Sequence, residues 1–265
     1  MNNSDHITIL KIGGSVITDK NADNGLAKKD EIKRLAREIS IYEGKLVVIH
    51  GAGSFGHPQA KRFSLVDRFN AEGAIITHRS VKELSDKIID SLNDAGVRAI
   101  AVHPMNCMVS SDGRITNMFL DNIHIMLDNG LVPVLHGDVV MDTVLGVSIV
   151  SGDQIVSYLG AALGAFRIGV GSAEDGVLDS QGYTVADITL DNFDQVKRHI
   201  GASQSTDVTG GMLGKVLELL ELCRTSGTTS YIFNAGVGGN VLSFLRGENI
   251  GTAIKQINKF NDGLP

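Results

Sequence analysis

A chain of 265 residues, 43% of them hydrophobic and 20% charged, can bury a sizeable core in one globular domain or in two closely packed lobes. Its net charge of −6 argues against a nucleic-acid partner, because such partners usually require a basic face. The sequence has no apolar run of the roughly 20 residues that cross a bilayer and no leader-like start, so we expect a cytoplasmic protein with no membrane partner.

Short apolar runs bounded by glycine alternate with longer amphipathic stretches, which is typical of an α/β fold with a largely parallel sheet. We expect strands at residues 7–12, 46–49, 98–102, 131–135, 167–170 and 230–233. We expect helices at residues 29–39, 77–95, 118–129, 153–163 and 211–224, and a β-hairpin at residues 139–150. Because there is no internal repeat or linker, we expect one domain over residues 1–265, with a boundary between lobes near Phe166.

The cysteines and glycines of the chain indicate what kind of site to expect. Cys107 and Cys223 lie far apart, with no CxxC spacing or Cys/His cluster, so the sequence predicts neither a disulfide framework nor a protein-bound metal. The 31 glycines provide many positions where backbone N–H groups can approach a ligand closely. An acidic protein that binds an anion needs such N–H groups together with a few lysines.

The first glycine-rich motif, Lys11-Ile12-Gly13-Gly14-Ser15, ends the first expected strand. Its glycines let successive N–H groups converge on an anion, and Lys11 adds a positive charge. A tight turn with a lysine facing water explains the same residues equally well. The motif matches neither the dinucleotide-binding GxGxxG pattern nor the P-loop pattern.

The second motif, HGAGSFGH at residues 50–57, follows the second expected strand. The carboxyl ends of parallel strands meet at one sheet edge, so these glycines and those of the first motif can form two adjacent phosphate sites, one for a donor and one for an acceptor. We interpret His50, at the strand end, as a packed structural histidine. His57 follows the glycines at the start of a helix, where an imidazole can face a bound anion.

Two further motifs open helices. In Ser151-Gly152-Asp153, the aspartate either caps the helix or holds lysine ammonium groups, and the two roles are compatible. In DVTGGMLGK at residues 207–215, a Gly-Gly turn precedes a helix that carries Lys215 in its first turns, which predicts another anion site. Lys11 and Lys215 could therefore bracket two phosphates of a nucleotide, and phosphoryl transfer needs little beyond alignment and charge neutralisation.

These four motifs, in this order and spacing, resemble the amino-acid kinase superfamily, and within it the archaeal-type isopentenyl phosphate kinases. The resemblance spans Leu10 to about Thr252, and the GSFGH segment is shared with fosfomycin-type phosphonate kinases. It implies a three-layer αβα sandwich, usually a homodimer, with the acceptor in the lobe of residues 1–165 and ATP with Mg²⁺ in the lobe of residues 166–265. It also implies phosphorylation of isopentenyl phosphate to isopentenyl diphosphate in an alternative mevalonate route of isoprenoid biosynthesis.

The resemblance also implies roles for individual residues, with no metal bound directly by the protein. The implied ATP contacts are Lys11, Gly13, Gly14, Ser15, Gly53, Asp175, Gly211 and Lys215. The implied acceptor contacts are Ala52, Gly53, His57 and Gly152. The implied catalytic residues are Lys11, Lys20, His57, Asp153 and Lys215, with Asp153 orienting the lysines and Lys20 near the transferred phosphoryl group.

One segment departs from the family pattern. Where related kinases usually read Thr-Asp-x-Asp-Gly, this chain reads Ser-Ala-Glu-Asp-Gly at residues 172–176, so the first carboxylate is missing at Ala173. This puts the affinity for ATP, or the preference for its base, in doubt. Two alternatives stay open: a kinase of the same fold that acts on another phosphate, phosphonate or carboxylate, and a weakened nucleotide- or effector-binding protein. Ile76, Leu84 and Ile88 are candidates for an isoprenoid pocket or for ordinary core positions.

Overall fold

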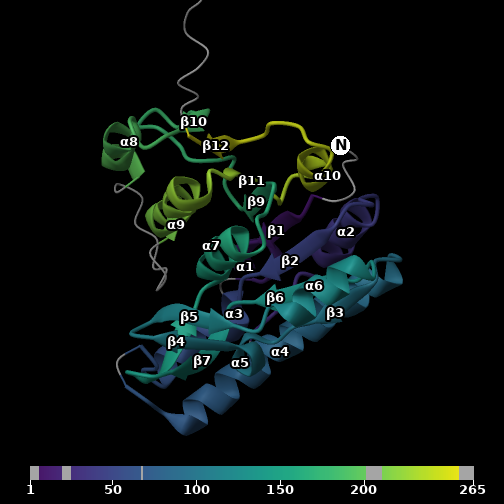
Figure 1. Ribbon diagram of the computed structural model, residues 1–265, viewed down its shortest axis with the longest axis vertical. Helices are drawn as coiled ribbons and strands as arrows, with labels where there is room; N and C mark the ends of the chain where they lie inside the picture. Colours follow the sequence, from purple (N-terminus) through teal and green to yellow (C-terminus); the bar gives the residue numbers. More distant parts are fainter. Residues whose placement is uncertain (1–5, 20–24, 67, 201–210, 257–265) are drawn as a thin grey trace, which may run out of the picture.

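The computed structural model describes residues 6–19, 25–66, 68–200 and 211–256. Within them, an eight-stranded sheet lies between two layers of helices (Figure 1), which confirms the predicted αβα sandwich. Every pair in the sheet is parallel except β11 with β12. The strands, in spatial order, are β10 (Asp187–Ile188), β12 (Thr252–Ile254), β11 (Thr229–Asn234), β9 (Arg167–Ser172), β1 (Thr8–Ile12), β2 (Leu46–His50), β6 (Val132–His136) and β3 (Ala99–Ala101).

The helices divide between the two faces of this sheet. One face is covered by α2 (Lys29–Ile39), α4 (Ala71–Asp94) and α10 (Asn240–Leu245). The other is covered by α6 (Asp121–Asp128), α7 (Gly152–Ala162), α8 (Phe193–Ile200) and α9 (Gly211–Ser226). Short helices follow three of the strands: α1 (Gly14–Ile17), α3 (Gly53–Arg62) and α5 (Pro104–Cys107). No helix among the described residues is long and apolar enough to cross a membrane.

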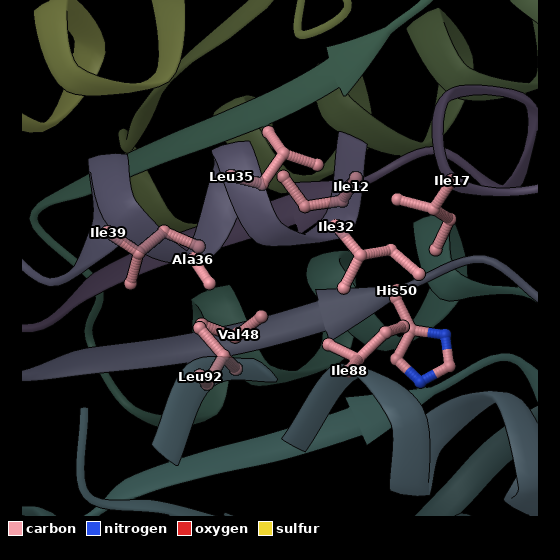
Figure 2. Close-up of a pocket in the computed structure, with 10 residues that line it drawn as sticks. All are labelled: Ile12, Ile17, Ile32, Leu35, Ala36, Ile39, Val48, His50, Ile88 and Leu92. Atoms are coloured by element: carbon pink, nitrogen blue, oxygen red, sulfur yellow. The ribbon is translucent and has the colours of Figure 1, made fainter. Parts of the chain in front are cut away.

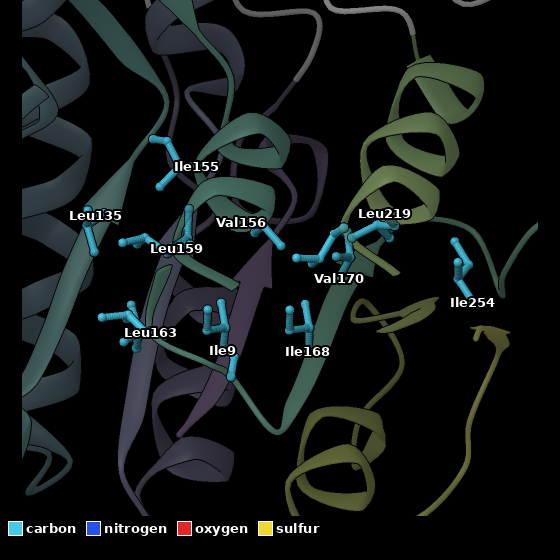
Figure 3. Close-up of a cluster of buried hydrophobic side chains, with 14 of the residues drawn as sticks. Ile9, Leu135, Ile155, Val156, Leu159, Leu163, Ile168, Val170, Leu219 and Ile254 are labelled. Atoms are coloured by element: carbon cyan, nitrogen blue, oxygen red, sulfur yellow. The ribbon is translucent and has the colours of Figure 1, made fainter. Parts of the chain in front are cut away.

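Side-chain alternation along the central strands assigns each residue to one face. Ile9 packs with Ile168 against α7 and α9 (Figure 3), whereas Leu10 and Ile12 pack against α2 and α4. Lys11 lies between two residues of the second group, so its side chain is on the α7 face. The alternation that builds both cores therefore also aims this lysine at the amino-terminal end of α7.

A second, smaller sheet lies beside the first in the order β5 (Arg114–Met118), β4 (Met108–Ser111), β7 (Asp138–Asp142) and β8 (Gly146–Val150). The hairpin of β7 and β8 confirms the prediction for residues 139–150. The hairpin of β4 and β5 was not predicted, and the expected helix at 118–129 starts only at α6, because Met118 still pairs with Met108. Likewise, α4 begins six residues before the predicted position 77, where the Asn70 side chain accepts a hydrogen bond from Gly73 N.

A buried carboxylate connects α2 to α10, which lie next to each other in Figure 1. Glu38 is 9% exposed, and its oxygens accept hydrogen bonds from Gly239 N (3.0 Å) and Leu242 N (3.2 Å) at the start of α10. The same carboxylate pairs with Arg34, whose guanidinium donates to Ala235 O. One side chain therefore satisfies free donors on an element about 200 positions later in the chain.

We predict that Glu38→Ala lowers the free energy of unfolding by about 1–3 kcal/mol, because it leaves buried donors of α10 without an acceptor. Urea unfolding followed by circular dichroism measures this loss. Glu31→Ala is the matched control: it lies on the same helix and also contacts Arg34, but its side chain is 37% exposed, so its loss should be smaller. Equal losses for the two variants would contradict the role given to Glu38.

Candidate active site

The glycines of the first two motifs pack backbone to backbone at the carboxyl ends of β1 and β2. A Cβ atom on Gly14 would lie 2.5 Å from Gly53 N, and one on Gly51 would lie 2.6 Å from Gly14 N. Gly53 also has a φ of +51°, which favours glycine. Any side chain at these positions would push the two loops apart, so their approach requires glycine.

Two of the predicted acceptor residues, Ala52 and Gly152, border one place on this sheet edge. A Cβ atom on Gly137, which follows β6, would lie 3.3 Å from Gly152 N and 3.7 Å from Ala52 N. A Cβ atom on Gly152 would in turn lie 3.3 Å from Lys11 Cε. Gly152 is the first residue of α7, where backbone N–H groups have no partner within the helix. The arrangement therefore combines N–H donors with a lysine, as an anionic ligand requires.

Asp153 lies between the two predicted lysines. Its oxygens are 2.9 Å from Lys11 Nζ and 2.8 Å from Lys215 Nζ, and all three side chains are at most 13% exposed. The cap of α7 is provided by Ser151, whose hydroxyl accepts from Gln154 N. Asp153 is therefore available for the lysines, and the predicted contact between them is confirmed.

The burial of this triad shifts its protonation. Burial lowers the pKa of Lys11 to about 8, with a further lowering from Lys215, although the charge of Asp153 acts in the opposite direction. Burial alone would raise the pKa of Asp153, but the two lysines hold it well below its usual range. Asp153 is therefore ionised near neutral pH, and Lys11 loses its proton at a pH well below that of an ordinary lysine.

The other predicted ATP residues lie on several elements. Gly13 N donates to Gly171 O (2.7 Å), so this N–H is engaged by the end of β9. Gly14 and Ser15 open α1, and Gly211 opens α9 with a φ of +56°. Lys20 and residues 207–210 lie outside the described residues.

The segment that departs from the family pattern lies at the ends of β9 and β11. Asp175 accepts a hydrogen bond from Asn234 Nδ2 (2.9 Å), a partner that the sequence did not reveal. The Ser172 hydroxyl donates to Glu174 O and accepts from Glu174 N, which holds the turn around the exposed Ala173. Asp175 is therefore the carboxylate of this turn whose position is fixed by a hydrogen bond, the one from Asn234.

His57 is half-buried in the second turn of α3, on the helix that begins at the glycine loop. His50, by contrast, is fully buried, as the structural interpretation of this residue expected. Among the candidates for an isoprenoid pocket, Leu84 and Ile88 belong to the core between the sheet, α2 and α4. Ile76 lines a surface groove together with the charged residues Arg79, Lys82, Glu83 and Asp86.

Comparison with known proteins identifies the family of this chain. The model of the amino acid kinase family matches residues 6–234. The chain belongs to that family. It is 36% identical to the isopentenyl phosphate kinase of Methanothermobacter thermautotrophicus over 93% of this chain and 98% of that protein. It is 38% identical to that of Haloferax volcanii over 94% and 98%. A crystal structure of isopentenyl phosphate kinase, 33% identical, superimposes with a TM-score of 0.81 over 94% of this chain and 100% of that one.

The low pKa of Lys11 predicts that ATP binding by this family member weakens as the pH rises. The phosphates attract the ammonium form, which the free protein loses above pH 8. Between pH 8 and the ordinary lysine pKa of 10.5, the dissociation constant of ATP should therefore rise, by at most about tenfold per pH unit. Calorimetric titration of ATP without acceptor, from pH 7.5 to 10, measures this change.

The control for this titration is Lys11→Arg, because a guanidinium stays protonated over the whole range. This variant should bind ATP with a dissociation constant that depends little on pH. If the dissociation constant of ATP rises with pH equally in the wild type and in Lys11→Arg, a group other than Lys11 controls the pH dependence.

Proposed function

We propose that this member of the amino acid kinase family is an isopentenyl phosphate kinase that uses ATP as phosphoryl donor. The observation that carries the proposal is its likeness to isopentenyl phosphate kinases over nearly the whole chain. An oxygen of the acceptor phosphate forms a bond to the γ-phosphorus of ATP, and the bond from that phosphorus to the oxygen bridging it to the β-phosphate breaks. The products are isopentenyl diphosphate and ADP.

The two lysines bracket the transferred group in this proposal. Lys11 comes from the lobe of residues 1–165, to which we assign the acceptor, and Lys215 from the lobe of residues 166–265, to which we assign ATP. Both contact Asp153, which fixes their separation. Because the transition state is loose and its charge is spread over the equatorial oxygens, two fixed cations stabilise it without covalent chemistry. Asp153 is occupied by the lysines, so we assign Mg²⁺ to the phosphates of ATP.

The acceptor phosphate lies, in this proposal, at the place bordered by the N–H groups of Ala52 and Gly152, with His57 as a further donor. A general base is unnecessary, because a phosphate monoester is already ionised at neutral pH. The apolar tail of isopentenyl phosphate would contact the cluster of Ala60, Leu65, Ala74, Val139 and Val147. This cluster is close in the chain to both sides of the site, since α3 carries Ala60 together with His57 and β8 leads into Gly152.

A homodimer and a cytoplasmic location remain predictions from the sequence, as does a place in an alternative mevalonate route. Retention of Lys11, Asp153 and Lys215 as a buried charged triad supports a working kinase over a weakened binding protein. A structural role alone would not require two buried lysines on one carboxylate, because burying charges is costly.

The proposal predicts a clear order of acceptors. In a coupled assay of ADP release, isopentenyl phosphate should give a kcat/KM at least about 100-fold above those of fosfomycin and N-acetylglutamate. Fosfomycin lacks the isoprenoid tail that would contact the apolar cluster, and N-acetylglutamate offers a carboxylate in place of the phosphate. Phosphorus NMR should detect a diphosphate product. If only fosfomycin or only N-acetylglutamate is phosphorylated, isopentenyl phosphate is not the acceptor. If none of the three is phosphorylated, the chain is better described as a binding protein.

His57 should be the side chain that makes the site selective for a phosphate acceptor over a carboxylate acceptor. We expect His57→Ala to lower kcat/KM for isopentenyl phosphate by about 10- to 100-fold, as for loss of a charge-assisted hydrogen bond. His57→Gln keeps a neutral donor and should recover part of this loss. The matched control is His124→Ala, an exposed histidine on α6, which should leave the kinetics unchanged. Wild-type kinetics in His57→Ala would leave His57 with a structural role only.

A further inference from the structure

His50 and His136 form a buried pair on the side of the sheet opposite Lys11. They end β2 and β6, pair in register, are both 0% exposed, and stack with ring centroids 5.4 Å apart. Figure 2 shows the His50 ring at one end of a cavity of about 20 Å³, whose other lining is apolar. Each histidine is followed directly by a glycine of the site, Gly51 or Gly137.

The hydrogen bonds of the pair determine which nitrogen carries the proton. His50 Nδ1 lies 3.1 Å from Gly51 O, and His136 Nδ1 lies 3.2 Å from Gly137 O. A carbonyl oxygen only accepts, so both Nδ1 atoms are donors. His136 Nε2 is then free to accept from His103 Nδ1 at 2.9 Å. Burial lowers the pKa of His50 to about 4, so its ring is neutral near pH 7.

The bond from His50 fixes the direction of the next peptide group. No peptide bond in the described residues is cis, and in a trans peptide the C=O and N–H point in opposite directions. With Gly51 O turned toward the imidazole, Ala52 N–H points away from it, toward the α7 face. The N atoms of Ala52 and Gly152 border the same place on that face. Gly51 N donates to Ile12 O (2.9 Å), so both backbone groups of this glycine are engaged.

Because position 51 is a glycine, the orientation of the peptide between Gly51 and Ala52 has to be held by another group. Contact with Gly14 N excludes any side chain there, and glycine rotates more freely than other residues. Rotation of the 51–52 peptide would exchange the Ala52 N–H for a carbonyl oxygen. A carbonyl oxygen would repel a phosphate dianion, whereas the N–H attracts it.

We propose that His50 is a positioning residue for the acceptor: its Nδ1–H holds the Gly51–Ala52 peptide so that Ala52 N–H faces the acceptor phosphate. This inference rests on the proposed function, because it uses the acceptor side assigned there. It gives the first histidine of the HGAGSFGH motif a role that reaches the substrate through the backbone. His57, at the other end of the motif, would reach the same phosphate directly.

Three substitutions of His50 and one control substitution at Ile88 separate this role from packing. His50→Leu removes the donor and should raise the KM for isopentenyl phosphate about tenfold or more while leaving the KM for ATP within about twofold, as for one lost hydrogen bond to a charged group. His50→Asn keeps an amide N–H near the position of Nδ1 and should restore much of the acceptor KM. His50→Gln extends its amide toward the position of Nε2 and should restore little. Ile88→Val, which changes the same cavity, should alter neither KM.

A binding measurement without turnover completes the test. Labelling with carbonyl-¹³C glycine and ¹⁵N alanine selects the Gly–Ala peptides, of which Gly51–Ala52 is one. Its amide signal should shift on addition of inorganic phosphate in wild type and in His50→Asn, and shift less in His50→Leu. Because this titration needs no phosphoryl transfer, it tests His50 even if the acceptor is a different phosphate.

The proposal is overturned by any of three results. The first is a wild-type acceptor KM in a folded His50→Leu protein. The second is an equal rise of both KM values, which would indicate general distortion of the site. The third is an unchanged response of the Ala52 amide to phosphate in His50→Leu.

Discussion

The contact of Asp153 with Lys11 and Lys215 is the interaction on which the organisation of the site depends. The three residues come from β1, α7 and α9. One carboxylate therefore joins the first of the four sequence motifs to the last. Two ammonium groups this close would repel each other without it. The amino-terminal turn of α7, which Ser151 caps, carries Asp153 and therefore sets the separation of the two ammonium groups. In the proposed function, it thereby also sets where they hold the phosphoryl group.

Next to this triad, backbone N–H groups, and not side chains, provide many of the hydrogen-bond donors. Gly14, Gly51 and Gly53 bring the loops after β1 and β2 into direct contact, and Gly137 leaves space in front of the N–H groups of Ala52 and Gly152. Such donors are fixed in place before any ligand arrives, provided that each peptide is held in one orientation. In our proposal, the buried His50 holds one of these peptides through the hydrogen bond from its Nδ1 to Gly51 O.

The sequence predicted the parts of this structure that depend on local patterns. Glycine-bounded apolar runs located six strands of the central sheet, and the motifs pointed to Lys11, Asp153 and Lys215, which lie in contact. The β4–β5 hairpin was missed because its short polar strands lack a clear alternating pattern and depend on pairing with β7. The partnership of Glu38 with α10 and that of Asp175 with Asn234 were also beyond prediction, because they join residues far apart in the chain. Gly137 lies two residues after the end of an expected strand and could have been noticed there, but its role depends on residues from other parts of the chain, Ala52 and Gly152.

The place of β1 in the sheet has a consequence for synthesis on the ribosome. This first strand lies between β2 and β9, so one of its two edges stays open until residues 167–172 have been translated. During that interval the nascent amino-terminal half can pair β1 with β2 but exposes the other row of N–H and C=O groups, which is a template for unwanted pairing with other chains. Crowded polysomes and slow codons before residue 167 should therefore be the conditions in which this enzyme most needs a chaperone.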